Sequence, residues 1–265
     1  MEPPNNETKL ALNIPVRENR KLEKAIKFIE NDVWLNTMWR CSNVMAMDRQ
    51  KLNDHGPIHI KIVANRALKI FRMLAKKDVA PSVRINYNMT DEDAEIVILL
   101  GSVLHDLGLA VTREKHEVYS VPLAYDFLKR ILPTIYETEA EVTIITSEVL
   151  HAVLTHHEPS YPYTLEAGIV KVADALDMEK GRARISTQEA SLNIHYVSAS
   201  AIEKVDILEG DIKPITIAIK MDNPAGVFQV SNLLAEKTRG SGLEKYLQVK
   251  VYIQGREEPI KLDLE

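Results

Sequence analysis

The chain has 265 residues, 45% of them hydrophobic, which suits a globular protein with one large domain or a large and a small one. A formal net charge of −5 gives no overall positive field for nucleic acid, so we expect no bulk nucleic-acid binding. The single cysteine, Cys41, excludes an intramolecular disulfide and a cysteine-based zinc site. No apolar stretch approaches the roughly 18 residues that span a bilayer, and no signal pattern opens the chain. We therefore predict a cytoplasmic protein without a membrane segment.

Helical spacing of apolar residues dominates the chain up to about residue 188. Before the first predicted helix, the proline-rich start of the chain predicts a flexible N-terminal arm over residues 1–20. Residues 81–89 are expected to form a polar loop. Thr90 and Asp93 then carry the signature of a capping box. The predicted helices span residues 21–38, a segment that begins at Pro57, 91–104, 118–132, 138–157 and 165–178.

After about residue 190 the pattern changes to the alternation that is typical of half-buried strands. Residues 192–196, 215–219 and 247–253 are the predicted strands, and a helix that starts at Asn223 and Pro224 lies between the last two. We predict a mainly α fold: a helical domain over residues 21–188, then a small α+β domain over residues 189–265 with an antiparallel sheet and one helix. Exposed strand edges favour a homo-oligomer, and a regulatory role is the other interpretation of this domain.

Residue types that bind metals recur through the helical part at wide spacing. His105 and Asp106 directly follow an apolar run, where two polar side chains would be costly to bury without a partner. Asp174 lies within an otherwise apolar helix. Imidazoles and carboxylates bind divalent transition metals well, although each residue taken alone also fits a structural or solvated position. The candidate set is His59, His105, Asp106, His116, His156, His157 and Asp174.

The order His, His-Asp, His, His-His, Asp resembles that of the HD superfamily of metal-dependent phosphohydrolases. The similarity covers roughly residues 50 to 185 and implies a helical bundle around a metal site. The implied ligands of one ion are His59, His105, Asp106 and Asp174. The His-His pair is similar to the two-metal HD-GYP phosphodiesterases, which implies that Asp106 bridges two ions. The implied ligands of the second ion are then Asp106, His116, His156 and His157.

The resemblance implies hydrolysis of a phosphate ester, either a nucleotide or a phosphodiester, by a metal-activated water. An imidazole-rich set favours Mn, Fe, Ni, Co or Zn over Mg alone as the one or two divalent ions. The candidate catalytic residues are Asp106, His55 and Lys171, which lies one helical turn before Asp174. The candidate substrate-binding cations, chosen for the affinity of guanidinium and ammonium groups for phosphate, are Lys171, Arg182 and Arg184.

The chain departs from the family pattern at Leu109, where many HD enzymes have a lysine after His-Asp-x-Gly. That lysine often contacts the substrate phosphate, so its loss puts the substrate class and the activity in question, and two other functions stay open. One is a regulatory or assembly protein that binds metal and nucleotide without turnover. The other is an endoribonuclease-like phosphodiesterase, because the His-His and Ala-Asp pattern resembles that of the HD domain of a membrane-anchored bacterial endoribonuclease. For the hydrolase and for the regulatory protein, the predicted partner is a small phosphate ester or a nucleotide.

Overall fold

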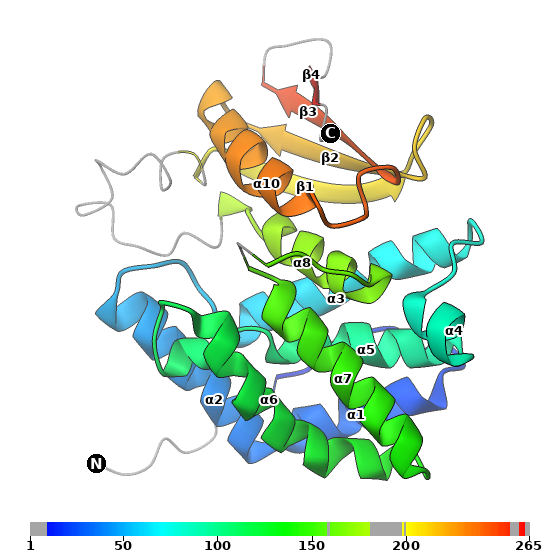
Figure 1. Cartoon of the computed structure of the whole chain (residues 1–265). Helices are drawn as coiled ribbons and strands as arrows, with labels where there is room; N and C mark the ends of the chain where they lie inside the picture. Colours follow the sequence, from blue (N-terminus) through cyan, green and yellow to red (C-terminus); the bar gives the residue numbers. More distant parts are fainter. Residues whose placement is uncertain (1–9, 158–159, 181–197, 199, 255–259, 263–265) are drawn as a thin grey trace.

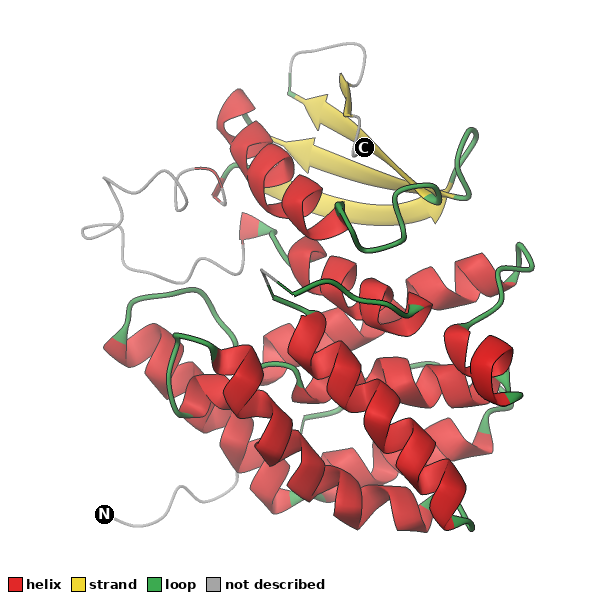
Figure 2. Cartoon of the chain, in the orientation of Figure 1, coloured by secondary structure: helices red, strands yellow, loops and turns green. Residues whose placement is uncertain are grey.

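The computed structural model describes residues 10–157, 160–180, 198, 200–254 and 260–262. Figure 1 shows a bundle of helices with a small sheet packed against one side of it, and Figure 2 shows the same division into helix and strand. The predicted fold class, mainly α with a small α+β part, is confirmed. The helices of the bundle are α1 (Arg20–Asn31), α2 (Val33–Asn43), α3 (Pro57–Ala75), α4 (Ser82–Tyr87), α5 (Asp91–Leu104), α6 (His116–Ile131), α7 (Glu139–Thr155) and α8 (Leu165–Leu176).

Helix α5 is the centre of the bundle. Every residue from Asp93 to Leu104 is buried, and α1, α3, α4, α7 and α8 all contact the helix. The predicted capping box is present, because Thr90 accepts a hydrogen bond from the Asp93 amide and Asp93 accepts one from the Thr90 amide at 2.9 Å. A helix that is apolar on all sides is stable only in an interior. It therefore ends inside the protein, at His105.

Two predicted elements of the bundle differ in the structure. The single helix expected over residues 21–38 is two helices, since Asp32 adopts an extended conformation and its side chain accepts a hydrogen bond from the Leu35 amide at 2.7 Å. Asp32 is thus the N-cap of α2. The loop expected over residues 81–89 contains α4, which ends where Asn88 takes a left-handed conformation with φ 56°.

The arm expected over residues 1–20 is packed on the bundle in its described part, from residue 10 onward. Leu12 and Ile14 are buried. Asn19 caps α1 and its amide donates to Glu95 at 2.9 Å. These apolar and polar contacts pack the segment beside α3 and α5, and the flexibility of the arm stays a prediction.

The small part contains a four-stranded sheet in the order β1-β2-β3-β4. Its strands are β1 (Ile202–Glu209), β2 (Ile215–Met221), β3 (Leu247–Ile253) and β4 (Ile260–Leu262). The outer pairs are antiparallel, but β2 and β3 are parallel, so the prediction of a wholly antiparallel sheet is wrong. The cause is the helical segment between β2 and β3, because a crossover returns the next strand in the same direction. The strand predicted over residues 192–196 lies outside the described residues.

The crossover segment joins the sheet to the bundle. It consists of a 3₁₀ turn (Pro224–Gly226), a π-helical turn (Gln229–Leu234) and α10 (Ala235–Thr238), and the last two contact α8. The backbones approach closely at Gly168 of α8, where an added Cβ would lie only 2.1 Å from the carbonyl oxygen of Ser241. Only glycine allows this contact, so the small domain packs directly on the helix that carries Asp174.

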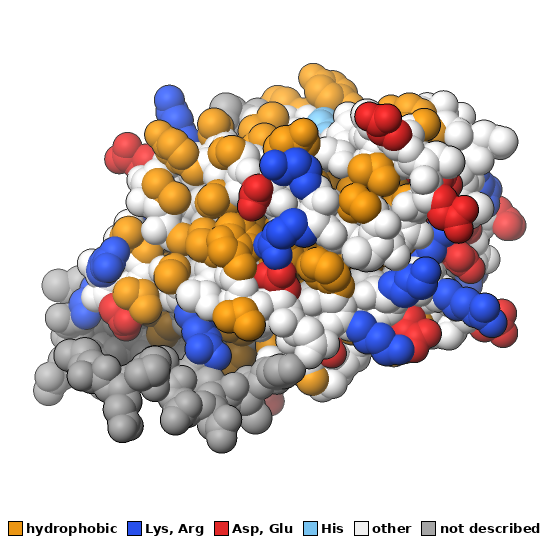
Figure 3. Space-filling model, turned by 90° about the horizontal axis from the view of Figure 1, so that it is seen from below, with side chains coloured by type: hydrophobic (Ala, Val, Ile, Leu, Met, Phe, Trp, Pro, Cys, Tyr) orange, Lys and Arg blue, Asp and Glu red, His pale blue; other side chains and the backbone are white. Residues whose placement is uncertain are grey.

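The surface seen in Figure 3, which is the underside of Figure 1, has apolar side chains interspersed with charges of both signs. This face has no uniformly positive field of the kind that holds a nucleic-acid backbone. Among the described helices, none has the length and apolar character needed to cross a bilayer.

The contact at Gly168 generates a stability prediction. Gly168→Ala should lower the free energy of unfolding by about 1–3 kcal/mol, because the new methyl group displaces the Ser241 backbone. The matched control is Gly101→Ala in α5, whose Cβ would meet only side-chain atoms of Ala152 and Val170, at 3.1 and 3.2 Å. Urea denaturation of both variants measures the difference. Equal stability of the two variants would contradict the close docking of the small domain.

Candidate metal centre

The candidate metal ligands of the bundle meet at the carboxyl end of α5. His105 and Asp106 end that helix, His59 lies in the first turn of α3, and Asp174 lies in the last turns of α8. His116 begins α6, and His156 and His157 follow α7. All of these side chains except His157, which is half-buried, are buried. The helical fold therefore gathers residues that are far apart in the sequence.

Four of these side chains form one compact group. The Nε2 atoms of His59 and His105 lie 3.3 Å apart. Asp106 Oδ2 lies 3.5 Å from His59 Nε2 and 3.3 Å from His105 Nε2. Asp174 Oδ1 lies 3.3 Å and 3.8 Å from the same two nitrogens. Two nitrogens and two carboxylate oxygens thus point toward one common centre.

A second group lies on the other side of Asp106. Asp106 Oδ1 is 3.3 Å from His116 Nε2 and 3.6 Å from His156 Nε2, and these two nitrogens are 3.2 Å apart. The ring of His157 lies 5.0 Å from that of His116, centroid to centroid. Each oxygen of Asp106 therefore faces a different set of histidines, so this one carboxylate lies in both groups.

The ends of the helices fix the orientation of the histidine rings. His105 and His156 are the C-cap residues of α5 and α7, and the Nδ1–H of each donates to the carbonyl three residues earlier, at 2.8 and 2.7 Å. His116 makes the same contact with Arg113 at 3.1 Å. A carbonyl can only accept, so the proton lies on Nδ1 and the lone pair on Nε2. The carbonyls at the ends of α5 and α7, which lack an intrahelical donor, and the carbonyl in the turn before α6 thus fix the direction of the ligand nitrogens.

His59 is oriented by a carboxylate that the sequence analysis did not identify. Asp177 Oδ2 accepts from His59 Nδ1 at 2.6 Å, and Asp177 itself is buried just after α8. A carboxylate behind a histidine fixes the tautomer and raises the basicity of the ligand nitrogen. Its position three residues after Asp174 was the only available signal, and a terminal helix carboxylate is too common to be diagnostic.

The charges in this centre suit a cation. Burial disfavours ionised Asp106, but His105 and His55 outweigh it and hold the pKa of Asp106 well below its usual range. Burial acts in the same way on Asp174, and there Lys237 and His59 keep the pKa of the carboxyl low. Burial lowers the pKa of His156 to about 3, so this imidazole is neutral at pH 7. Ionised carboxylates and neutral imidazoles are the forms that bind metals.

Gly108 and Ser120 fix the His-Asp turn against α6. A Cβ on Gly108 would lie 2.0 Å from the carbonyl oxygen of His116, so a larger residue would separate the two parts of the site. The Ser120 hydroxyl donates to the His105 carbonyl at 2.6 Å and accepts from the Gly108 amide at 2.8 Å. The glycine of the His-Asp-Leu-Gly sequence is thus required by the close approach of two ligand-bearing segments.

His55 lies at the site, as its predicted pocket role requires. Its Nδ1 atom is 2.8 Å from Asp106 Oδ2, and the residue lines a cavity of about 180 Å³ in front of the two groups. Lys171 does not line that cavity. Its side chain is fully buried and its ammonium donates to the Ser160 carbonyl at 2.9 Å and lies over the Tyr161 ring. Arg182 and Arg184 lie outside the described residues.

Two other cations line the cavity and were missed by the sequence analysis. Lys237 of α10 contacts Asp174 Oδ2 directly, and Arg113 lies in the loop before α6. Lys237 comes from the small domain, 63 residues after Asp174, together with Gln229 and Leu233. No local pattern links such distant residues, whereas the position of Arg113 between two ligand-bearing turns of the chain was a signal that could have been used.

The donor set fits a divalent ion of the transition series. Two atoms bound to one ion at about 2.0–2.2 Å lie about 3.0–3.5 Å apart in tetrahedral or octahedral geometry. Most of the distances within each group match this range. Further triads with compatible spacing are His55, His59 and Asp106, and His105, Asp106 and His156. The residues present could therefore hold one or two ions.

Asp177→Asn tests the orientation of His59. The amide should weaken binding of Mn²⁺ by about 10–100-fold, because it removes the carboxylate behind a ligand nitrogen without removing the ligand. Isothermal titration of the metal-free protein with Mn²⁺ measures this change. Asp126→Asn, on an exposed position of α6, is the control and should leave the affinity unchanged. Equal affinities of the two variants would exclude the role given to Asp177.

Comparison with known proteins agrees with this geometry. The family model of the HD domain matches residues 58–179, which include His59, Asp174 and every candidate ligand between them. The chain is also 42% identical over 226 residues to the uncharacterized protein MJ1020 of Methanocaldococcus jannaschii, an alignment that covers 85% of this chain and 86% of that protein. The chain belongs to the HD-domain family.

Proposed function

We propose that this protein is a metal-dependent hydrolase of phosphate esters, with a nucleotide or a phosphodiester as substrate. HD domains belong to a superfamily of metal-dependent phosphohydrolases. The observation that carries the proposal is the position of Asp106, whose two oxygens face two separate histidine groups at 3.3–3.6 Å. This arrangement supports two neighbouring divalent ions, with Mn, Fe, Ni, Co or Zn favoured by the imidazole ligands.

The ligands proposed for the two ions follow from the two groups. One set is His59, His105, Asp106 and Asp174, and the other is Asp106, His116, His156 and His157. Bound ions would supply an activated water and would neutralise charge on the phosphoryl oxygens. Asp106 would fix the spacing of the two groups, and the helix-end carbonyls would keep each imidazole in place. The proposal thus gives all of the seven candidate ligands the role of binding metal ions.

The cavity in front of the ligands suits a phosphoryl group. Its volume of about 180 Å³ is below the roughly 300–1,000 Å³ of pockets that enclose a whole small ligand. We infer that the phosphoryl group enters it and that the rest of the substrate lies toward the small domain. His55 lines the cavity beside Asp106, and we assign it the role of holding Asp106 or of protonating the leaving oxygen.

Lys237 and Arg113 are the cations that we assign to the substrate phosphate. Both line the cavity, whereas Lys171 is held by the Ser160 carbonyl. Lys237 would supply the positive charge that many HD enzymes obtain from a lysine at the position of Leu109. In this assignment the small domain completes the site, since α10 brings Lys237 onto the carboxylate of Asp174. Homo-oligomer formation and a cytoplasmic location stay predictions from the sequence.

Asp106→Ala tests the hydrolase proposal. The wild-type chain with Mn²⁺ should hydrolyse a substrate within a panel of phosphomonoesters, phosphodiesters, nucleotides and cyclic dinucleotides. Asp106→Ala should reduce turnover by at least about 1,000-fold, because both groups lose a ligand. Phosphate release or chromatography of the products measures the rate, and thermal unfolding checks that the variant folds. Wild-type protein that binds nucleotide and Mn²⁺ tightly without turnover would instead support a regulatory protein.

Lys237→Gln tests the contribution of the small domain. Loss of the ammonium should reduce kcat/KM by about 10–100-fold, as for other charge-assisted contacts to a phosphoryl group. Lys237→Arg should retain most of the activity. The matched control is Lys220→Gln on an exposed position of β2, which removes the same charge from the same domain. If Lys237→Gln and the control have equal rates, Lys237 does not contact the substrate.

A further inference from the structure

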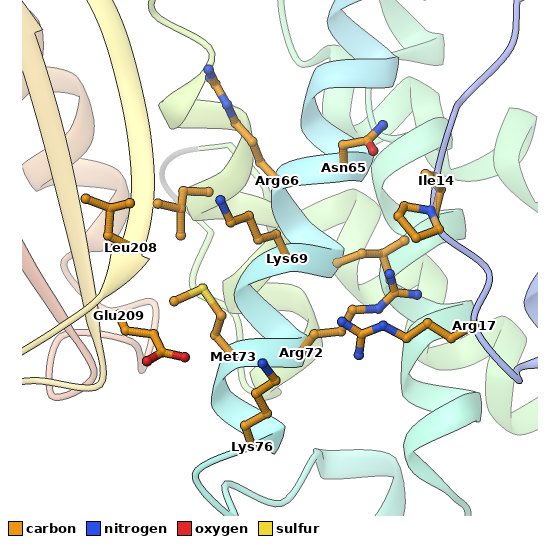
Figure 4. A pocket seen from close by; sticks show the side chains of 13 residues that line it. Ile14, Arg17, Asn65, Arg66, Lys69, Arg72, Met73, Lys76, Leu208 and Glu209 are labelled. Carbon is orange, nitrogen blue, oxygen red and sulfur yellow. The ribbon is translucent and has the colours of Figure 1, made fainter.

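A second and larger cavity lies away from the metal centre. It has a volume of about 540 Å³ and is formed where α3, the N-terminal segment and β1 meet (Figure 4). Among the described residues, the two cavities share no lining residue. Its volume falls within the roughly 300–1,000 Å³ that is usual for small-molecule sites. The proposed hydrolase reaction gives this cavity no role.

The charges that line this cavity are strongly biased. Five of the described lining residues are cations and only Glu209 is an acid. Figure 4 shows that four of the cations leave one helix, α3, while the fifth comes from the N-terminal segment on the opposite side. The cations are Arg17, Arg66, Lys69, Arg72 and Lys76. Arg66 and Arg72 are paired with Glu179 and Glu95, at 2.7 and 2.6 Å, so the excess positive charge that favours an anion comes from Arg17, Lys69 and Lys76.

Arg72 gives independent support for a ligand. The residue is 8% exposed, and its Nε atom donates to Glu95 at 2.6 Å. Its Nη2 atom has no hydrogen-bond partner among the described residues. A buried guanidinium N–H without an acceptor is unfavourable, and buried polar groups are nearly always paired. An anionic oxygen in the cavity would satisfy this donor.

Apart from Asn65 and Glu209, the remaining wall of the cavity is apolar. Ile14 and Pro15 lie on one side, Met73 lies on α3, and Ile207 and Leu208 come from β1. Leu208 is 48% exposed although it belongs to a strand of the sheet. A free inorganic anion would use only the cations, whereas a molecule with a phosphate and a flat apolar part would use both walls.

We propose that this cavity is a second ligand site, which binds a phosphate-bearing small molecule with an aromatic or apolar part, as in a nucleotide. The phosphates contact Arg17, Lys69 and Arg72. The base or its equivalent packs against Met73 and Leu208. Guanidinium groups bind phosphate oxygens through paired hydrogen bonds, and apolar walls add affinity for the flat part. This site is independent of hydrolysis at the metal centre.

The test uses the full-length wild-type chain in EDTA, titrated calorimetrically with inorganic triphosphate, adenosine, and each of the four ribonucleoside triphosphates. At least one nucleotide should bind more tightly than triphosphate or adenosine. Lys69→Glu should weaken that binding at least about tenfold, because a cation that faces the phosphates becomes an anion. Lys69 is exposed, so the variant is expected to fold, which thermal unfolding checks.

Two controls separate this site from the metal centre. Lys24→Glu makes the same charge change at an exposed position of α1 and should leave the affinity within about twofold. Lys237→Gln should also leave it unchanged, since Lys237 lines the other cavity. Four results would overturn the proposal: no nucleotide binding at millimolar concentration, no effect of Lys69→Glu, an equal effect of Lys24→Glu, or loss of binding in Lys237→Gln. Loss of binding in Lys237→Gln would place the ligand at the metal centre instead.

Discussion

The buried carboxylate of Asp106 is the constraint on which the rest of the structure depends. An ionised carboxylate in an interior is stable only when positive groups or ligands surround it, and here its two oxygens face two histidine groups. To bring Asp106 to this position, the chain uses α5, which is apolar on every side and is enclosed by five other helices. The core of the bundle and the polar cluster at its end are therefore parts of one arrangement. The hydrophobic packing that stabilises α5 also sets where the carboxylate lies.

The histidines are held by groups that the fold has left without other partners. The last carbonyls of α5 and α7 lack intrahelical donors, and the Nδ1–H groups of His105 and His156 supply them. The same hydrogen bond that satisfies the helix end fixes the tautomer of the ligand. His59 lies at the start of its helix, where such carbonyls are absent, and a carboxylate, Asp177, takes their place. A helix end thus orients His105 and His156, the Arg113 carbonyl of the preceding turn orients His116, and a carboxylate orients His59.

The sequence allowed the helical class, the capping box at Thr90 and the order of the ligands to be predicted, because each depends on local spacing. The role of Lys171 could not be judged in the same way. A residue three positions before Asp174 lies near it on the helix, but a long side chain reaches several partners, and the Ser160 carbonyl binds this one. Lys237 and the parallel pairing of β2 and β3 both follow from the crossover segment. Its path over α8 is set by long-range packing, such as the contact of Gly168 with Ser241, which no local pattern reveals.

Helix α3 connects the candidate metal centre with the larger cavity. Its first turn carries His59, and its later turns carry Arg66, Lys69 and Arg72. Arg66 donates to Glu179 at 2.7 Å and to the Leu176 carbonyl, and its guanidinium lies 3.9 Å from the Asp177 carboxylate that orients His59. Glu179 also accepts from the Val205 amide of β1 at 3.0 Å, so the same residues join the helix, the strand and the metal centre. A packed interior transmits displacement because it has few voids. A change in the position of Arg66 would therefore act on both the edge of the sheet and the orientation of a metal ligand.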